Sequence, residues 1–418
     1  MNRYVRLASV AVIALSFVSA TQAEEAGKRR ISLDQALAEA ATLSPVLAAR
    51  RASLEEAEAR LITAETYPHN PELAIDGANR EGGGDSSTDW AVRLTQPMEI
   101  GGQRGRRVAR ASADLDTAVA GFRREERLLA ARVAAVFVES LRARELLDVE
   151  RANAELVQSL ADVAGKRFEA GDIPQIGVNL AQAQVGRAER SRRLARSAYD
   201  VACAALAEVV GLDPMHAPEP LGELALPPST PAPVSELLAG ALLHRSDLEA
   251  LRSTIEAAQA RIELARREVV PDLALQAFYG REDGTDRVLG GGVAIRIPLF
   301  NRNRGAIAEA RASERRAASD HEAAELRVRR EVVEARIRYE AAVDVTATLQ
   351  ENVVGTLEDN LSLLQRSFEA GKTGWAEVLV FRREFIDSRR AFVESLANVW
   401  LASVELDLAA GRSPVTAP

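Results

Sequence analysis

Hydrophobic residues recur every three or four positions along two long stretches of the chain, residues 98–173 and 299–413. In the first stretch the repeating positions include Val133, Phe137 and Leu141. In the second, the same spacing runs through Leu349, Val353, Leu357, Leu361, Leu364 and Phe368. Neither stretch contains proline, which breaks helices, and the spacing is typical of helices that pack as coiled coils. The pattern predicts very long helices and a mainly α-helical fold.

The two stretches belong to an internal repeat that covers most of the chain. The tetrapeptide Phe168-Glu169-Ala170-Gly171 returns at residues 368–371. Each repeat is expected to contain a helix, a pair of strands, a long helix, a glycine turn and a returning helix. The expected ranges are 32–66, 71–98, 103–170 and 174–211 in the first repeat, and 235–268, 271–299 and 373–411 in the second. A continuous helix over 103–170 measures roughly 100 Å at 1.5 Å per residue. Pro45 should kink the first helix or begin its second part.

The N-terminus has the pattern of a secretory signal peptide. Arg3 and Arg6 precede an apolar run, and a small-x-small site ends at Ala23. A buried N-terminal helix is the alternative. The expected boundaries are 1–23 for the signal, 24–213 for the first repeat, 214–233 for a proline-rich connector, 234–411 for the second repeat and 412–418 for the tail.

The strand segments alternate between apolar and polar or small residues, the pattern of a membrane-spanning barrel strand. The outward-facing set is Leu73, Ile75, Trp90, Val92, Leu94, Leu273, Leu275, Tyr279, Val293, Ile295 and Ile297. Loops at 80–88 and 281–286 are expected to be exposed hairpin tips. Two ordinary surface hairpins would give the same pattern. If the strands do span lipid, their open edges must be closed. Three chains would then form a twelve-stranded barrel continued by a hollow cylinder of helices.

Composition removes several other classes of protein. The formal net charge is −8 and aromatic residues make up 4%, which argues against a nucleic-acid partner. The four histidines form no metal-binding spacing, and Gly82–Gly84 and Gly290–Gly292 lack nucleotide-binding spacing. We therefore expect no enzyme activity, no cofactor and no protein metal site. The single cysteine, Cys203, is expected to be a buried packing residue rather than a reactive thiol.

With these features the chain resembles the TolC-like outer-membrane efflux family. The segment Gln96-Pro97-Met98-Glu99-Ile100-Gly101-Gly102-Gln103-Arg104 is most similar to the cobalt–zinc–cadmium resistance branch, where a Gly-Gly-Lys-Arg-like motif ends the second strand. Gln103 replaces that lysine here. The resemblance implies a homotrimer with a twelve-stranded barrel in the outer-membrane lipid and a helical barrel in the periplasm of a Gram-negative cell.

The resemblance also implies a function and partners. The trimer would be the passive exit duct of a tripartite efflux system, served by an RND-type inner-membrane pump and a periplasmic adaptor. Divalent heavy-metal cations are the expected cargo. Drug efflux or type I protein secretion by the same fold is one alternative. A soluble periplasmic coiled-coil scaffold or adaptor is the other.

Two groups of site residues follow from the resemblance. The adaptor-docking tips are Ala170, Gly171 and Asp172 in the first repeat and Ala370, Gly371, Lys372 and Thr373 in the second. Several of these depart from the common family tip. Glu377 matches an acidic position that closes the periplasmic end in the family, and Lys372 is a second gate candidate. A solvated helix face is the alternative for both.

Overall fold

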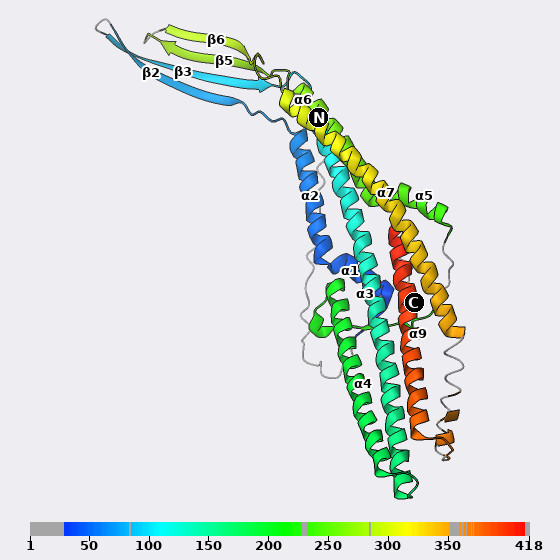
Figure 1. The fold of residues 1–418 in the computed structure, drawn as a ribbon. Coiled ribbons are helices and arrows are strands. Elements are labelled where there is room, and N and C mark those ends of the chain that lie inside the picture. Colours follow the sequence, from blue (N-terminus) through cyan, green and yellow to red (C-terminus); the bar gives the residue numbers. More distant parts are fainter. Residues whose placement is uncertain are drawn as a thin grey trace, which may run out of the picture.

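The computed structural model describes residues 29–82, 85–227, 232–283, 286–351, 360, 363–364, 366–368, 370 and 372–413. The chain is elongated, with one small sheet at one end and long helices that run away from it (Figure 1). The predicted signal peptide and Gly371 lie outside the described residues. No helix of the described part combines the length and hydrophobicity needed to cross a bilayer.

The first helical segment consists of α1 (Leu33–Leu43) and α2 (Pro45–Glu65). Ser32 begins α1 with a capping box, in which its hydroxyl accepts from the Gln35 amide and the Gln35 side chain accepts from the Ser32 amide. Pro45 starts α2, as predicted, because the first turn of a helix needs no amide donor there.

The matching segment of the second repeat is also two helices, α5 (Val234–His244) and α6 (Ser246–Arg267). The prediction of one helix over 235–268 is therefore wrong. No proline causes this break. The backbone is extended at Arg245, whose guanidinium binds the carboxylates of Asp247 and Glu331 at 2.7 Å. Tertiary ion pairs thus stabilise a break that local sequence does not signal.

The long helices match the prediction closely. They are α3 (Gln103–Glu169), α4 (Gln175–Val210), α7 (Arg304–Leu349) and α9 (Trp375–Ala409). Helix α3 has 67 residues, which corresponds to roughly 100 Å. It packs against α4 on one side and α9 on the other, and α9 packs against α7. Helix α7 therefore forms one lateral side of the chain, and the other side is formed by α2 near the sheet and by α4 further from it (Figure 1).

The sheet contains β2 (Glu72–Gly82), β3 (Asp85–Met98), β5 (Leu273–Glu282) and β6 (Asp286–Ile295), in that order and antiparallel throughout. The predicted loops are too long, because pairing continues to Gly82 opposite Asp85 and to Glu282 opposite Asp286. Strand β6 ends at Ile295, so Ile297 lies beyond it. Within the described chain, the outer edges of β2 and β6 have no partner strand.

The proline-rich connector is partly structured. It contains a 3-10 turn, η1 (Pro214–His216), and a short strand, β4 (Glu219–Pro220), which pairs in parallel with β1 (Arg30–Ile31). The Trp400 indole also donates to the Ala225 carbonyl at 2.6 Å. The connector is therefore anchored to the start of the chain and to α9.

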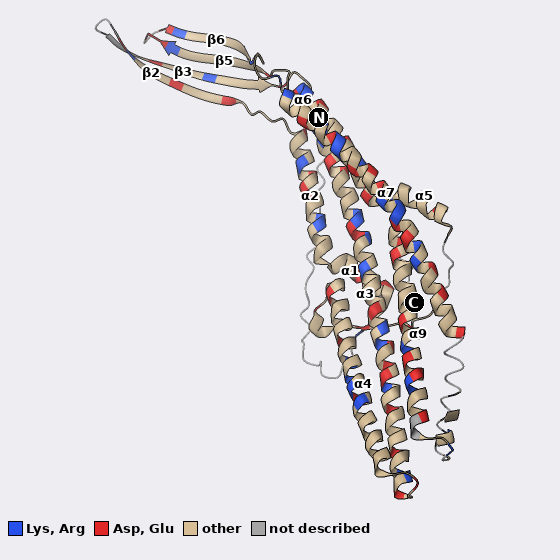
Figure 2. Ribbon diagram, viewed as in Figure 1, with Lys and Arg blue, Asp and Glu red and all other residues tan. Residues whose placement is uncertain are grey.

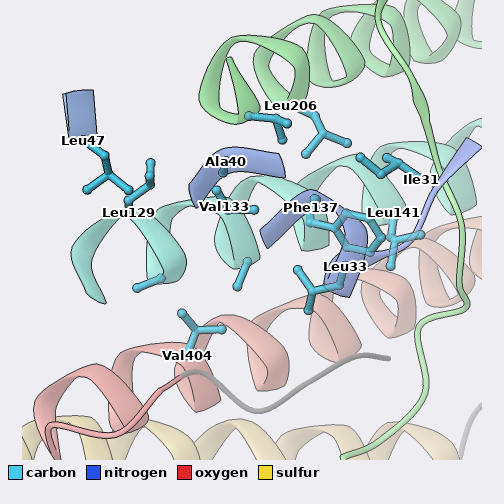
Figure 3. Packing of buried hydrophobic residues seen from close by; sticks show 14 residues of the cluster. Ile31, Leu33, Ala40, Leu47, Leu129, Val133, Phe137, Leu141, Leu206 and Val404 are labelled. Atoms are coloured by element: carbon cyan, nitrogen blue, oxygen red, sulfur yellow. The ribbon is translucent and has the colours of Figure 1, made fainter. Parts of the chain in front are cut away.

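Two apolar clusters hold the middle of the molecule together. The first joins α1, α3 and α4 through Leu33, Phe137 and Leu206, all at most 2% exposed (Figure 3). The second joins α5, α7 and α9 around Leu237, Val332, Val399 and neighbouring residues. Cys203 is buried beside Tyr199 in a smaller cluster, which confirms its predicted packing role.

Candidate channel surfaces

One face of the sheet is mostly apolar over its middle part, with polar residues toward the hairpin ends, although much of it is exposed. The register places Leu73 beside Leu94, and Val92 between Ile75 and Tyr279. All of the predicted outward-facing residues within the strands lie on this face, and only Ile297 is outside the sheet. Ile75 is 74% exposed. An apolar face of this extent is typical of a surface that contacts lipid or another chain.

Sequence analysis missed one prominent member of this face. Leu289 lies opposite Tyr279 and is 80% exposed. It continues the alternation from Val293 back through Gly291, and that continuation was the available signal. Next to it, Trp90 and Tyr279 stack edge to face with their ring centroids 5.7 Å apart. Tryptophan and tyrosine favour the boundary between lipid and water.

The opposite face of the sheet is mostly polar or small, with Phe278 and Val288 as its large apolar residues. It carries Asp76, which lies 3.7 Å from Arg93, and Gln276. At the hairpin ends, Arg80 pairs with both Asp89 and Asp283, which links the two hairpins. Charged residues are few on the strands and frequent along the helices (Figure 2). The sheet therefore has the apolar and polar faces that a barrel wall requires.

The Gly101-Gly102-Gln103 motif has a structural role at the junction between β3 and α3. A side chain at Gly101 would place its Cβ 2.7 Å from Val270 Cβ, and Gly102 has a left-handed φ of +72°. Gln103 is buried, and its Nε2 donates to the Val270 carbonyl at 3.2 Å and to Asp272 at 3.3 Å. The motif therefore ties the first repeat to the linker that precedes β5 in the second.

A charged pair reinforces this junction. Arg107 on α3 makes two hydrogen bonds to the carboxylate of Glu99, whose side chain is 8% exposed. The hydrogen bond to Glu99 raises the pKa of the Arg107 guanidinium despite its partial burial. The junction between β3 and α3 is thus fixed by the close backbone approach at Gly101, the hydrogen bonds of the Gln103 side chain and the ion pair of Arg107 with Glu99.

The helix tips follow the internal repeat in detail. In the first tip, Gly171 has a φ of +79° and the Asp172 amide donates to the Arg167 carbonyl at 2.8 Å. In the second, the Lys372 amide donates to the Ser367 carbonyl at 2.9 Å. The two hydrogen bonds join residues related by the same offset. Of the other predicted tip residues, Ala170 is exposed, Ala370 lies in a turn and Thr373 is partly buried.

The gate candidate Glu377 lies in the first turn of α9 and is exposed. Its carboxylate accepts a hydrogen bond from the Gly374 amide at 3.2 Å. It therefore satisfies an amide that the helix itself leaves unpaired. Lys372 is exposed as well. The geometry gives Glu377 a capping role, and the gating role of both residues stays a prediction.

Sequence analysis also missed a buried polar cluster between the helices. Glu150 and Asn153 on α3 are 4% and 5% exposed. Arg390 on α9 donates to Glu150 at 2.7 Å, and Arg382 donates to Asn153 at 3.0 Å. Burial lowers the pKa of the Arg382 guanidinium. The available signal was the position of both α3 residues in the apolar spacing between Leu147 and Val157.

A four-stranded sheet with one exposed apolar face, joined to helices of this length, defines the class of outer-membrane channels with a periplasmic helical part. The sequence profile described as Outer membrane efflux protein matches residues 33–212 and 237–412. The chain belongs to this outer membrane efflux protein family, which confirms the predicted family, location and channel class.

Individual relatives agree with this assignment. The chain is 27% identical over 388 residues to the cobalt-zinc-cadmium resistance protein CzcC of Cupriavidus metallidurans, covering 91% of this chain and 90% of the relative. It is 28% identical over 293 residues to the nickel-cobalt-cadmium resistance protein NccC of Alcaligenes xylosoxydans xylosoxydans, covering 68% and 64%. A solved structure of CusC has a TM-score of 0.77 at 16% identity and covers 91% of this chain and 92% of its own. This last likeness confirms the mainly helical fold class.

Proposed function

We propose that three copies of this chain form the outer-membrane exit duct of a tripartite efflux system. The single observation that carries the proposal is the sheet with two unpaired outer edges, β2 and β6, and one exposed apolar face. Open edges do not occur in lipid, and three such sheets close into twelve strands, an even number typical of bacterial barrels. The polar face then lines the lumen.

The lateral helices support the same closure. Within the chain, Val138 of α3 packs against Ala397 and Trp400 of α9. At the 200-residue offset of the repeat, the corresponding positions are Arg338 on α7 and Ser197 and Asp200 on α4. The apolar side chains next to them, Ile337 and Val201, are 59% and 66% exposed. Packing α7 of one copy on α4 of the next would repeat the α3–α9 contact and cover both side chains. The helices would then form a closed cylinder below the barrel.

The cargo proposed is a divalent heavy-metal cation. Two relatives named for resistance to cobalt, zinc, cadmium or nickel support this substrate class. The described residues contain no group of three metal-ligating side chains. In this proposal the ions pass through a wet lumen, driven by the inner-membrane pump.

The periplasmic adaptor is proposed to dock on the helix tips. The first tip exposes Asp172, and the following turn of α4 exposes Ile176, which is 74% accessible. An exposed apolar residue beside a glycine turn suits contact with a partner helix. At the mouth, Glu377 and Lys372 are the proposed gate residues.

A deletion strain tests the cargo, and fractionation tests the duct. We expect the protein in the outer-membrane fraction as a trimer with heat-dependent gel mobility. Recovery as a soluble periplasmic monomer would contradict the duct and favour a scaffold or adaptor. Loss of the gene should sensitise cells to zinc, cobalt, cadmium, nickel or copper. Sensitivity confined to drugs or detergents would contradict the metal cargo.

A further inference from the structure

The polar face of the sheet carries a single aromatic side chain among the described strand residues, Phe278 on β5. The other aromatic residues of the sheet, Trp90 and Tyr279, belong to the apolar face. If the polar face lines a lumen, as proposed above, Phe278 is the largest apolar side chain of the described strands on the wall of that lumen. Its orientation therefore bears on how wide the duct is.

The Phe278 ring lies flat over Gly290 of β6, its cross-strand neighbour. A Cβ added at Gly290 would lie 2.8 Å from Cε1 and 3.0 Å from Cε2 of the ring, and would approach Cζ still more closely. These three atoms form the outer edge of the ring. The ring therefore extends sideways across the neighbouring backbone rather than standing away from the sheet.

The other glycines in the same run have no such neighbour. A Cβ at Gly291, on the apolar face, would meet only the Gln276 carbonyl at 3.3 Å. A Cβ at Gly292, on the same polar face as Gly290, would meet only Gln276 Oε1 at 3.9 Å. Of these three glycines, only Gly290 has a side-chain ring in the place that its own Cβ would occupy. The glycine at this position is therefore what leaves room for Phe278.

We propose that Phe278 and Gly290 together set the width of the outer-membrane part of the duct. Glycine at position 290 leaves room for the ring on the wall, so three rings in the trimer stay out of the path of the cargo. A side chain at position 290 displaces the ring toward the lumen, where three rings occupy space that water and ions otherwise fill and so narrow the path. The inference rests on the proposed trimeric duct.

The test is single-channel conductance of the purified trimer in planar bilayers, with G290A as the decisive variant. G292A adds the same methyl group to the same face and is the matched control. We expect the conductance of G290A to be lower than that of the wild type, by up to about twofold, because the displaced rings narrow the path. G292A should conduct as the wild type does. The double variant F278A/G290A should recover at least the wild-type conductance, because no ring remains to be displaced.

Failure of the role proposed for Phe278 and Gly290 gives a different result from failure of the proposed duct. If the wild-type trimer conducts but G290A and G292A are equal, the role of Phe278 and Gly290 is refuted while the duct stands. A G290A loss that F278A does not reverse also refutes it, because the defect then lies in the sheet and not in the ring. If the wild-type protein forms no channel, the proposed duct itself fails. Heat-dependent gel mobility of each variant confirms that the trimer has assembled.

Discussion

The carboxylate of Glu150 on α3 accepts a hydrogen bond at 2.7 Å from Nε of Arg390 on α9, within the buried polar cluster between these two helices. The Glu150 side chain is 6% exposed and that of Arg390 is 37% exposed. A nearly buried carboxylate is costly unless a cation pairs with it. The pair therefore fixes the position of α9 along α3, about halfway between the core clusters and the helix tips.

Removing the cation should destabilise this interface. R390A leaves Glu150 buried without its partner, and we expect a loss of about 2–4 kcal/mol, at the lower part of the range for buried pairs because Arg390 is partly exposed. R383A removes an arginine that is 82% exposed and pairs with Asp387 on the surface, and should change stability by less than about 0.5 kcal/mol. Thermal unfolding in detergent and hydrogen exchange of α9 measure both. Equal effects of the two variants would contradict the role of Arg390.

The junction motif leads to a prediction about Gln103. Its Oε1 is buried and accepts no hydrogen bond within the described residues, while its Nε2 donates to Val270 and Asp272. Q103K replaces the unpaired oxygen by an ammonium that donates to the same two acceptors. We expect Q103K to be at least as stable as the wild type, and Q103L to lose about 1–2 kcal/mol because the hydrogen bonds to Val270 and Asp272 are lost. A thermal unfolding series checks the order, and Q103K below Q103L would contradict it.

Much of the helical architecture was predictable because its causes are local. Apolar spacing and the absence of proline located α3, and Pro45 marked the start of α2. The break at Arg245 was not predictable, since its ion pair to Glu331 comes from a residue 86 positions away. The strands were predicted to end too early for a similar reason. The ion pair between Arg80 and Asp283 joins the ends of the two hairpins, which belong to different repeats.

The candidate site was predicted unevenly. Alternation along each strand assigned Leu73 and Tyr279 to the apolar face correctly. The hydrogen bonds of Glu377 and Gln103 depend on how the chain is folded around them, so residue type alone did not reveal them. The same holds for the ring of Phe278 over Gly290, which only the register of β5 against β6 brings together.

The stabilisation that the Asp247–Arg245 ion pair gives to the helix break should weaken at acid pH. Burial raises the pKa of the Asp247 carboxyl, but the hydrogen bonds and charge of Arg245 exceed this effect and the pKa lies below its ordinary value. The ionised form therefore stabilises the fold fully above about pH 3.9, the unfolded value, and this contribution is lost as the pH falls from there through the lower pKa of the folded state. The difference in stability between wild type and D247N should shrink from pH 7 to pH 3. A difference that stays constant would contradict the assignment.

The proposed contact between copies predicts a specific cross-link. In a C203S background, V201C and I337C in one chain should form a disulfide between neighbours and give a covalent trimer on non-reducing gels. V201C combined with L326C is the control. Leu326 is also exposed on α7, but it lies 11 residues from Ile337, roughly 16 Å along the helix. Cross-linking of the control pair alone would place α4 and α7 in a different register.

The two roles of Glu377 can be separated by comparing a neutral isostere with a truncation. E377Q keeps an oxygen that accepts from the Gly374 amide and removes the charge, whereas E377A removes both. If three Glu377 carboxylates form a ring at the mouth, multivalent cations should block single-channel current in the wild type, and both variants should weaken that blockade. If Glu377 acts only as a helix cap, E377Q should behave as the wild type in blockade. E377A should then lose about 1 kcal/mol of helix stability without any change in blockade. Blockade measured with a trivalent cation, together with hydrogen exchange over the first turn of α9, distinguishes the charge from the cap.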